Sequence, residues 1–466
     1  MQIARTGFTV FWIASVRERL CNRCRATPNP KEKIMRSRRE LMKAALAGGA
    51  FAANLAGWAT AWAQEQPFKP EPGAKLQFLR WGKFLDAEDQ ATKANIAAFS
   101  QATGTEVVLT SESMDDIQAK VAVAANVGSG ADVVWALHTT PHLFSDKLID
   151  ISDVADYAGS KAGGWYPLIE QYGKSNGRWI GISPVVIGVF PVYRVSMVKA
   201  AGFDRFPTDT DGFLKLCEAL KTNKTPAGFT FGKAPSDGNS FCHWLLWSHG
   251  ASVTDEAGKV SLDSPSTIRA LEYARALYDT FVEGIISWSD ASNNQAFLAG
   301  KISLTNNSVS ILGKARADKL PMADDIDHAV WPVGAAGKPT ELHLVYPMMA
   351  FKHTKYPNAA KAFLAFLLER AQYEKLLESS AGYVSQSLKA YETSPVWQKD
   401  PKIAAFKDAA ARGLPVSYPA PVTFAAASVL ADFVVIDMFS QVVSGQAMPK
   451  DAAARAAKLA QRHYRA

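Results

Sequence analysis

The sequence predicts an α/β protein of two lobes, each a mixed and mostly parallel sheet flanked by helices, with a ligand cleft between the lobes. Strand-like and helix-like patterns alternate from residue 75 to residue 136, which is typical of a sheet covered by helices on both faces. The stretch Ile182–Met197 then runs from an apolar strand through two prolines into a helix-forming run, as expected where a chain leaves one lobe and enters another. At 466 residues and 48% hydrophobic, the chain is long enough to bury more than one core.

The net charge of +7 is concentrated near the N-terminus. Residues 1–63 hold eleven Lys and Arg and three acidic residues, which leaves 40 basic against 41 acidic residues in 64–466. Proteins that bind nucleic acid by neutralising phosphates need a basic surface, and residues 64–466 have no excess of basic residues to form one. The sequence therefore predicts no nucleic-acid partner.

The basic N-terminal extension, residues 1–63, has the pattern of an export signal. Ser37–Lys43 contains two consecutive arginines, and Ala44–Ala63 follows without a charged residue and ends in an A-x-A motif. This order predicts a twin-arginine signal peptide that is cleaved near Ala63, so the mature protein is expected in the periplasm. An uncleaved membrane-spanning helix is the alternative. Translation starts either at Met1 or at Met35.

The first part of the mature chain alternates regularly between strands and helices. Apolar runs predict strands, and apolar residues three and four apart predict helices. Strands are expected at Lys75–Trp81, Glu106–Ser111 and Asp132–Ala136. Helices are expected at Asp89–Thr103, which Gly104 ends, and over Met114–Ala124.

After Ile182–Met197 the chain is mainly helical. Ser264 before Pro265 predicts a helix N-terminus, because serine caps the first turn and proline suits the first helical position. Further helices are expected around Phe213–Leu220 and at Asn293–Leu298, Pro357–Leu368, Pro401–Arg412, Phe424–Val443 and Lys450–Tyr464. Strands are expected at Lys301–Thr305, Trp331–Val333 and Leu344–Phe351.

No motif for catalysis, a cofactor or a metal stands out. The sequence has no G-x-S-x-G, HExxH, complete Walker A or G-x-G-x-x-G motif. His138 and His142 are four residues apart, but Pro141 between them argues against one helical face and so against a metal site. We therefore expect no cofactor, no metal and no enzyme activity. Cys217 and Cys242 form a disulfide or remain as two buried thiols.

Aromatic and amide residues gather at strand ends, where ligands of open α/β sheets bind. Aromatic rings stack on the apolar face of a sugar, and amides, imidazoles and carboxylates hydrogen-bond its hydroxyl groups. Core packing remains the alternative for the tryptophans, a turn for the two asparagines, and ordinary surface positions for the charged residues. The candidate ligand-binding residues are Trp81, Lys83, Glu112, Trp135, His138, Phe241, Trp244, Asn306, Asn307, His343 and Tyr346.

Several segments resemble a known family in both content and order. They are Gly130–Ala136 (GADVVWA), Val192-Tyr193 before SMVKAAGF, Ala296–Ser308, Asn358–Val384 and Lys399–Gly413. Over residues 74–466 the chain resembles the extracellular solute-binding proteins of ABC importers, in the class of maltodextrin-binding protein. The resemblance implies a two-lobe periplasmic binding protein of type II, monomeric, that delivers a small ligand to a permease in the inner membrane. It also implies three crossings between lobe 1 (residues 74–188 and 343–382) and lobe 2 (189–342 and 383–466).

The chain departs from that family at two expected stacking positions. Asn306–Ser310 contains no aromatic residue, and Phe424–Val443 lacks a tryptophan near its start, so a long α-glucan is not expected. Arg194 stands where many members have asparagine, and nothing in the sequence explains it.

The resulting prediction is a periplasmic binding protein that captures a small sugar or polyol by lobe closure. Pro184, Gly188 and Pro191 would determine where the first crossing bends. One alternative is a charged solute such as a sugar phosphate, a polyamine or an amino-acid derivative. The other is an enzyme exported by the twin-arginine route.

Overall fold

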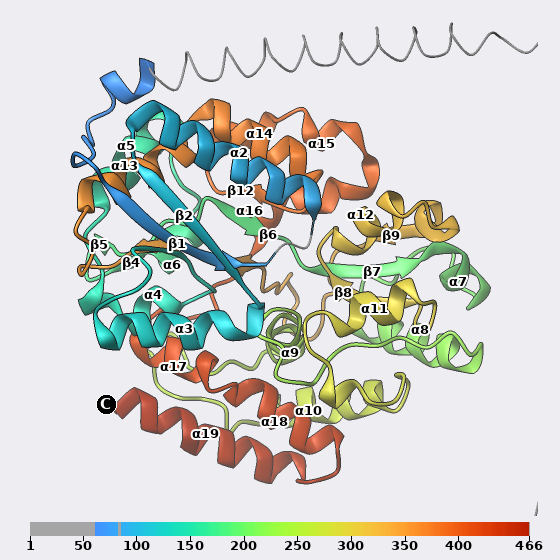
Figure 1. The fold of residues 1–466 in the computed structure, drawn as a ribbon. Coiled ribbons are helices and arrows are strands. Elements are labelled where there is room, and N and C mark those ends of the chain that lie inside the picture. Colours follow the sequence, from blue (N-terminus) through green and yellow to red (C-terminus); the bar gives the residue numbers. More distant parts are fainter. Residues whose placement is uncertain (1–60, 83–84, 466) are drawn as a thin grey trace, which may run out of the picture. The chain divides into compact units, whose positions relative to one another are not determined.

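A computed structural model describes residues 61–82 and 85–465 of the chain (Figure 1). The description below concerns the unit Trp58–Ala466, within these residues. The expected twin-arginine segment and both candidate start sites lie outside the described residues.

The first sheet has the strand order β11-β3-β1-β2. Strand β1 (Lys75–Trp81) runs parallel to β2 (Glu106–Glu112) and to β3 (Val133–Trp135), while β11 (Met348–Ala350) is antiparallel to β3. The three strands expected in this part of the sequence are confirmed. Strand β1 buries five of its seven residues and β3 all three.

The helices that follow β1 and β2 are also confirmed. Helix α2 (Asp86–Thr103) ends at Gly104, which adopts the left-handed conformation and donates its N–H to Ser100. Helix α3 (Met114–Val127) begins at Ser113, whose side chain accepts from the backbone of Asp116. Both helices run beside β1 and β2 in Figure 1.

Shorter elements and two returning helices complete this part of the fold. Helices α13 (Pro357–Leu367) and α14 (Arg370–Ser380) both pack against α2, although more than 250 residues separate them in the chain. The shorter elements are α4 (Thr140–Leu143), η1 (Ser145–Lys147), α5 (Ser152–Lys161), α6 (Pro167–Gly173), β4 (Lys174–Ser175) and β5 (Arg178–Trp179).

A small sheet joins the segments that were expected to cross between the lobes. Its order is β10-β6-β12, and both outer strands are antiparallel to the central one. The strands are β6 (Val185–Ile187), β10 (Leu344–Val345) and β12 (Ser385–Gln386). The expected single strand Leu344–Phe351 is therefore two strands, β10 here and β11 in the first sheet. The lobe boundaries proposed from the sequence stay a prediction.

The second sheet follows directly from the small one. Strand β7 (Phe190–Arg194) is antiparallel to both β8 (Leu304–Asn307) and β9 (Ile326–His328), so both strand pairings of this sheet are antiparallel. Arg194, at the end of β7, forms an ion pair with Asp325 at 2.7 Å. The helices of this part are α7 (Val195–Ala200), α8 (Thr210–Thr222), α9 (Asp237–Ser248), α10 (Pro265–Tyr278), α11 (Ser292–Leu298) and α12 (Ser310–Ala317), with η2 (Ile285–Ser287) and η3 (Pro321–Asp325).

Three expectations for the second half of the chain were wrong in detail. Trp331–Val333 forms only an isolated bridge from Val333 to Asp209, because Trp331 is packed into the aromatic core. Pro401–Arg412 divides into the 3₁₀ helix η5 (Pro401–Asp408) and α16 (Ala409–Arg412), and η4 (Lys389–Thr393) and α15 (Val396–Lys399) precede them.

The third error concerns the apolar stretch Phe424–Val443, which forms two helices. Phe433 adopts a left-handed conformation (φ 55°) and separates α17 (Phe424–Ala431) from α18 (Val434–Val443). By length and composition alone this stretch could cross a membrane, but most of it is buried against the rest of the protein. The last helix, α19 (Pro449–Arg465), packs on both α17 and α18 (Figure 1).

Candidate functional site

A cavity with an empty volume of about 340 Å³ lies where the small sheet meets the ends of several helices. Each of the three segments that form the small sheet contributes to its lining. Ile187 and Val189 come from the first segment, Leu344 and Tyr346 from the second, and Tyr383 from the third. Pockets that bind small molecules combine apolar walls with a few converging polar groups.

The polar side of the cavity is built on two buried aspartates. Asp290 accepts hydrogen bonds from the backbone N–H groups of Ser236, at 3.1 and 3.2 Å, and of Asp237, at 2.9 Å. Asp237, the first residue of α9, accepts through Oδ2 from the side-chain amides of Asn293, at 2.8 Å, and Asn307, at 3.2 Å. This network holds the amides and carboxylates of α9, α11 and β8 in fixed positions beside the cavity.

Burial raises the pKa of Asp237 well above its ordinary value, and the neighbouring carboxylate of Asp290 adds to the shift. Asn293 opposes the shift through its hydrogen bond, because it stabilises the ionised form. The two carboxylates thus interact across the polar wall, and the protonated form of Asp237 can donate a hydrogen bond as well as accept one.

The aromatic side of the cavity is supported from behind by two tryptophans. The hydroxyl of Tyr346 hydrogen-bonds Ser236 Oγ at 2.7 Å, and its ring centroid lies 4.9 Å from that of Trp81. Trp135 packs on Trp81 at 4.8 Å and donates from Nε1 to the Tyr346 carbonyl at 2.7 Å. Trp81 and Trp135 therefore orient Tyr346 rather than line the cavity themselves.

A buried ion pair lies next to these tryptophans. Arg80 hydrogen-bonds both oxygens of Glu88, at 3.0 and 2.9 Å, and both side chains are almost completely buried. The guanidinium of Arg80 lies 5.1 Å from the ring of Trp81 and 5.0 Å from that of Trp135.

Of the residues predicted from the sequence, Asn307 and Tyr346 line this cavity. Asn306 lies directly behind it and donates from its amide to the Asp237 carbonyl at 3.0 Å. With Trp81 and Trp135, the structure thus brings five of the predicted residues to the cavity or to its immediate support.

Phe241 and Trp244 lie instead in the core of the second half of the fold. Neither ring is among the side chains that line the cavity, and both belong to α9, in which every residue is buried. Trp244 stacks on Trp331 with centroids 4.7 Å apart and donates from Nε1 to the Pro332 carbonyl. The apolar content that suggested a stacking platform belongs to a fully buried helix.

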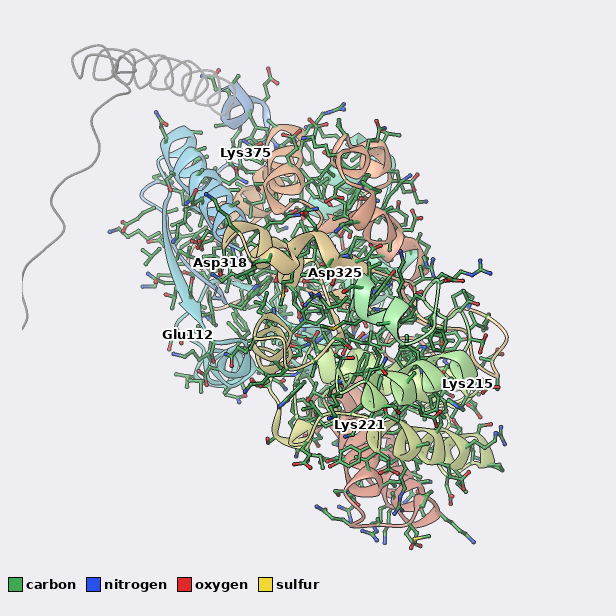
Figure 2. The ribbon with its side chains drawn as sticks, turned by 90° about the vertical axis from the view of Figure 1, so that its right-hand side faces the viewer. Glu112, Lys215, Lys221, Asp318, Asp325 and Lys375 are labelled. Carbon is green, nitrogen blue, oxygen red and sulfur yellow. The ribbon has the colours of Figure 1, made fainter. Side chains whose placement is uncertain are left out.

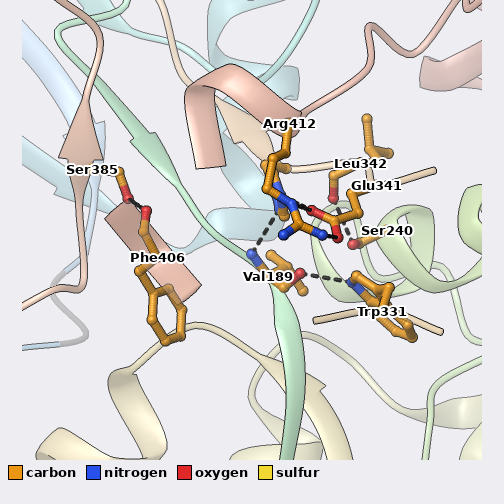
Figure 3. Close-up of polar contacts among 9 residues, drawn as sticks. Val189, Ser240, Trp331, Glu341, Leu342, Ser385, Phe406 and Arg412 are labelled. Atoms are coloured by element: carbon orange, nitrogen blue, oxygen red, sulfur yellow. Dashed lines mark hydrogen bonds and ion pairs between the residues drawn. The ribbon is translucent and has the colours of Figure 1, made fainter. Parts of the chain in front are cut away.

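His343 belongs to a buried polar cluster with Glu341 and Arg412, and these last two residues are labelled in Figure 3. Its Nδ1 accepts from the backbone N–H of Val189 at 3.1 Å, so its Nε2 donates to Glu341 at 3.0 Å. Glu341 also binds Arg412, at 2.5 and 3.1 Å. Burial favours the neutral form of Glu341, but His343 and Arg412 together hold its pKa below the ordinary value. His343 therefore connects crossing segments rather than facing the cavity.

The last three predicted residues also lie away from the cavity. His138 lines a second cavity of about 320 Å³, and its Nε2 hydrogen-bonds the Pro235 carbonyl at 2.8 Å. Burial lowers the pKa of His138 to about 4, so it is neutral near pH 7. Glu112 is at the end of β2, paired with Lys120 at 2.7 Å (Figure 2). Lys83 lies outside the described residues.

Several lining residues were missed from the sequence, namely Asp237, Asp290, Asn294 and Tyr383. Asp237 follows a Pro-Ser pair and precedes glycine, and Asp290 lies between serine and alanine in a loop, so both resemble ordinary turn residues. Only the fold brings these two positions together.

Cys217 and Cys242 are buried and free, which answers the question that the sequence left open. Within residues 61–82 and 85–465, no group of three or more His, Cys, Asp and Glu side chains is placed to hold a metal ion.

A family model described as "Bacterial extracellular solute-binding protein" matches residues 94–405. A probable ABC transporter-binding protein of Deinococcus radiodurans is 24% identical over 301 residues, which cover 63% of this chain and 69% of that protein.

Solved structures of the same kind share the fold. The maltose-bound MalE3 of T. maritima aligns with a TM-score of 0.73 and 20% identity over 84% of this chain and 99% of that one. An ABC transporter solute-binding protein of Agrobacterium radiobacter, in complex with ribitol, aligns with a TM-score of 0.72 and 18% identity over 85% and 100%. One from Agrobacterium vitis, with bound D-mannitol, aligns with a TM-score of 0.68 and 16% identity over 84% and 99%. These likenesses confirm the fold class expected from the sequence.

Proposed function

The chain belongs to the bacterial extracellular solute-binding proteins, and from this premise we propose that it captures a small carbohydrate, a sugar or a polyol, by closure of its two lobes. The family is non-catalytic and serves ABC transporters, so the protein delivers its solute to a transporter. The proposed partner in that step is the permease in the inner membrane.

The cavity lined by all three crossing segments is the observation that supports this function. Amide and carboxylate groups of Asn307, Asn294 and Asp237 offer the donors and acceptors that hydroxyl groups require. The rings of Tyr346 and Tyr383 offer apolar faces for the carbon skeleton. Solved structures of the same fold hold maltose, ribitol and D-mannitol, which is consistent with such a ligand.

The proposed closure follows from the position of the lining residues on two different parts of the fold. Asp237 and Asn307 belong to α9 and β8, whereas Tyr346 and Tyr383 lie on segments next to the small sheet. A ligand that contacts both sets only in the closed arrangement shifts the population toward that arrangement. No covalent step is needed.

The test is a binding screen of the purified protein with sugars and polyols. A ligand at 100 times its Kd should stabilise the protein by about 2.7 kcal/mol and raise its Tm. It should also change tryptophan fluorescence, because Trp81 and Trp135 pack behind Tyr346, and should reduce the radius of gyration measured by X-ray scattering.

A matched pair of variants ties the result to this cavity. Asn307→Ala should weaken binding at least about tenfold, since it removes an amide beside the ligand and leaves Asp237 without one donor. Asn223→Ala is the control, because Asn223 is exposed, does not line the cavity, and donates from its side-chain amide to the Ala200 carbonyl. If no sugar or polyol changes either Tm or fluorescence, the carbohydrate assignment is wrong.

Export by the twin-arginine route is a separate part of the proposal. Cleavage after Ala63 would remove Trp62, whose ring packs 5.0 Å from that of Phe366 and donates from Nε1 to Glu369. The mass of the periplasmic protein should correspond to a chain beginning at Gln64. Replacing Arg38 and Arg39 by lysine should leave the protein in the cytoplasm, and periplasmic accumulation of that variant would contradict the route.

A further inference from the structure

The cavity lined by Tyr346, called the first cavity below, has a neighbour of similar size. The empty volume is about 340 Å³ in the first cavity and about 320 Å³ in the second. Pro235 lines the second cavity, and Ser236, the next residue of the chain, lines the first. His138 lines the second cavity, and its ring centroid lies 5.2 Å from that of Tyr346. The two cavities therefore share a wall.

Two hydrogen bonds hold this wall together. His138 donates from Nε2 to the Pro235 carbonyl at 2.8 Å, since a carbonyl oxygen can only accept. The hydroxyl of Tyr346 and Ser236 Oγ are 2.7 Å apart. His138 and Tyr346 come after strands β3 and β10, whereas Pro235 and Ser236 directly precede α9, so each bond joins two different parts of the fold. The imidazole of His138 thus stands between the two cavities.

The backbone of His138 adopts a conformation that is unfavourable for a residue with a side chain. Its φ is 44°, in the left-handed region. Residues other than glycine are uncommon there, and they concentrate at ligand sites and switch regions, where the surrounding structure holds them. Glycine would adopt this conformation without the cost, so the histidine at this position indicates that its ring has a use.

The second cavity offers the same kinds of groups as the first. Gln118 of α3 contributes a side-chain amide and Thr139 a hydroxyl, and both can hydrogen-bond the hydroxyl groups of a sugar. Because the two cavities are similar in size, a ligand of two similar units would place one unit in each. The apolar part of the second lining consists mainly of Leu137, Leu143, Leu430 and Phe433.

We propose that His138 limits the ligand to a single sugar or polyol unit, because its imidazole closes the first cavity toward the second. This inference rests on the proposed function, since it names the residue that sets the length of the carbohydrate in the same site. The second unit of a longer ligand would have to displace the imidazole and break its hydrogen bond with Pro235. Selectivity of this kind comes from a group that obstructs the wrong ligand, without any added contact to the right one.

The experiment compares single units with compounds in which the same unit is joined to a second. The pairs are glucose with maltose, galactose with melibiose, and D-glucitol with maltitol, and any further sugar or polyol found in the binding screen is paired with its α-glucoside. Titration calorimetry at neutral pH should give at least about tenfold weaker binding for the two-unit compound of the pair whose single unit binds. A two-unit compound that binds as tightly as its single unit would overturn the inference.

Variants of His138 test the role of its ring. His138→Gly removes the imidazole and suits the left-handed backbone, so it should open the wall without strain. In this variant the two-unit compound should bind within about twofold of the single unit, or more tightly. His138→Asn repeats the test with a shorter side chain that also tolerates the left-handed conformation, so a folding defect in one variant does not decide the result.

Two further variants assign the effect to the passage between the cavities. His353→Gly is the matched control, because His353 also hydrogen-bonds a backbone carbonyl, that of Ala131 at 3.0 Å, and is not among the described residues that line either cavity. It should leave the preference for the single unit unchanged. Ala431→Phe, added to His138→Gly, fills the second cavity from the end of α17 and should restore the weak binding of the two-unit compound.

The possible outcomes separate the inference from the function beneath it. If both His138 variants keep the preference of the unaltered protein for the single unit, the assignment to His138 is wrong and the carbohydrate function stands. If the unaltered protein binds only two-unit compounds, the limit to a single unit is wrong and the carbohydrate function again stands. If no sugar or polyol of either length binds, the carbohydrate function falls, and the inference with it.

Discussion

Glu341 is a fully buried carboxylate. It accepts hydrogen bonds from the guanidinium of Arg412 (Figure 3) and from the imidazole of His343. Replacing it by glutamine keeps the volume but leaves Arg412 and His343 without their charged acceptor. Breaking a buried ion pair from one side typically costs about 3–5 kcal/mol. Glu341→Gln should therefore lower the free energy of unfolding by several kcal/mol, measured by urea denaturation.

A control for this variant lies on the surface. Glu112 pairs with Lys120, and the two side chains are 23% and 50% exposed. Glu112→Gln should change the free energy of unfolding by no more than about 1 kcal/mol, because solvent screens such a pair. Equal effects of the two substitutions would show that the Glu341 cluster does not stabilise the fold.

The sequence predicted the position of some site residues correctly and that of others incorrectly. Asn307 is the last residue of β8, Tyr346 directly follows β10, and both lie at the cavity, as the rule for strand ends anticipates. Trp244 and His343 are also residue types that can bind a sugar, but Trp244 packs in the aromatic core and His343 belongs to a buried ion cluster. Asp237 and Asp290 resemble turn residues in the sequence. Residue type indicates what a side chain can do, and only its contacts show where it does so.

Among the elements, helix α14 ends with an unusual residue. Ala381 adopts the left-handed conformation, with φ 48° and ψ 42°, and is exposed. The left-handed conformation costs a residue other than glycine about 1–2 kcal/mol. Glycine avoids this cost but loses more conformational entropy on folding, which offsets part of the gain. Ala381→Gly should therefore stabilise the protein by up to about 1 kcal/mol, measured by thermal and urea unfolding.

The same substitution inside a helix should have the opposite sign. Ala454 is exposed in the interior of α19, where glycine costs about 1 kcal/mol relative to alanine. If Ala381→Gly destabilises as much as Ala454→Gly does, backbone strain at Ala381 is not relieved by glycine.

The elements of the first sheet were predictable because their local signals agree. Strand β1 has four apolar residues among its seven, and Gly104 marks the end of α2. The break at Phe433 was not predictable, because neither glycine nor proline marks it. At Gly188 the expected bend is also a tight contact, since an added Cβ would lie 2.8 Å from the Phe190 ring and 2.9 Å from the Phe406 ring. A β-branched residue there would therefore disturb packing as well as closure.

For the whole molecule, buried histidines predict how stability depends on pH. Burial lowers the pKa of His138, His243 and His328 to about 4 each. Between pH 4 and 6.5 the unfolded chain binds protons that the native protein does not, so stability falls as the pH falls. Asp237 acts in the opposite direction, because its pKa is raised and the native state keeps its proton.

The three histidines outweigh the single aspartate over this range. Each group changes the slope of the free energy of unfolding against pH by up to about 1.4 kcal/mol per pH unit. With three histidines acting against one aspartate, the free energy of unfolding should be lower by about 3 kcal/mol at pH 5 than at pH 7. Urea denaturation at the two pH values measures the difference, and His328→Gln should reduce it. Equal or greater stability at pH 5 would contradict the assignment of neutral buried histidines.

The small sheet β10-β6-β12 connects the three segments that the sequence predicts to cross between two lobes. Three separate linkers would let two bodies twist, bend and slide independently of one another. Here the two outer strands are hydrogen-bonded to the same central strand, so a rotation of one segment is transmitted to the others. The proposed closure would then have few independent coordinates, and a rapid-mixing experiment with ligand should record a single exponential relaxation after binding.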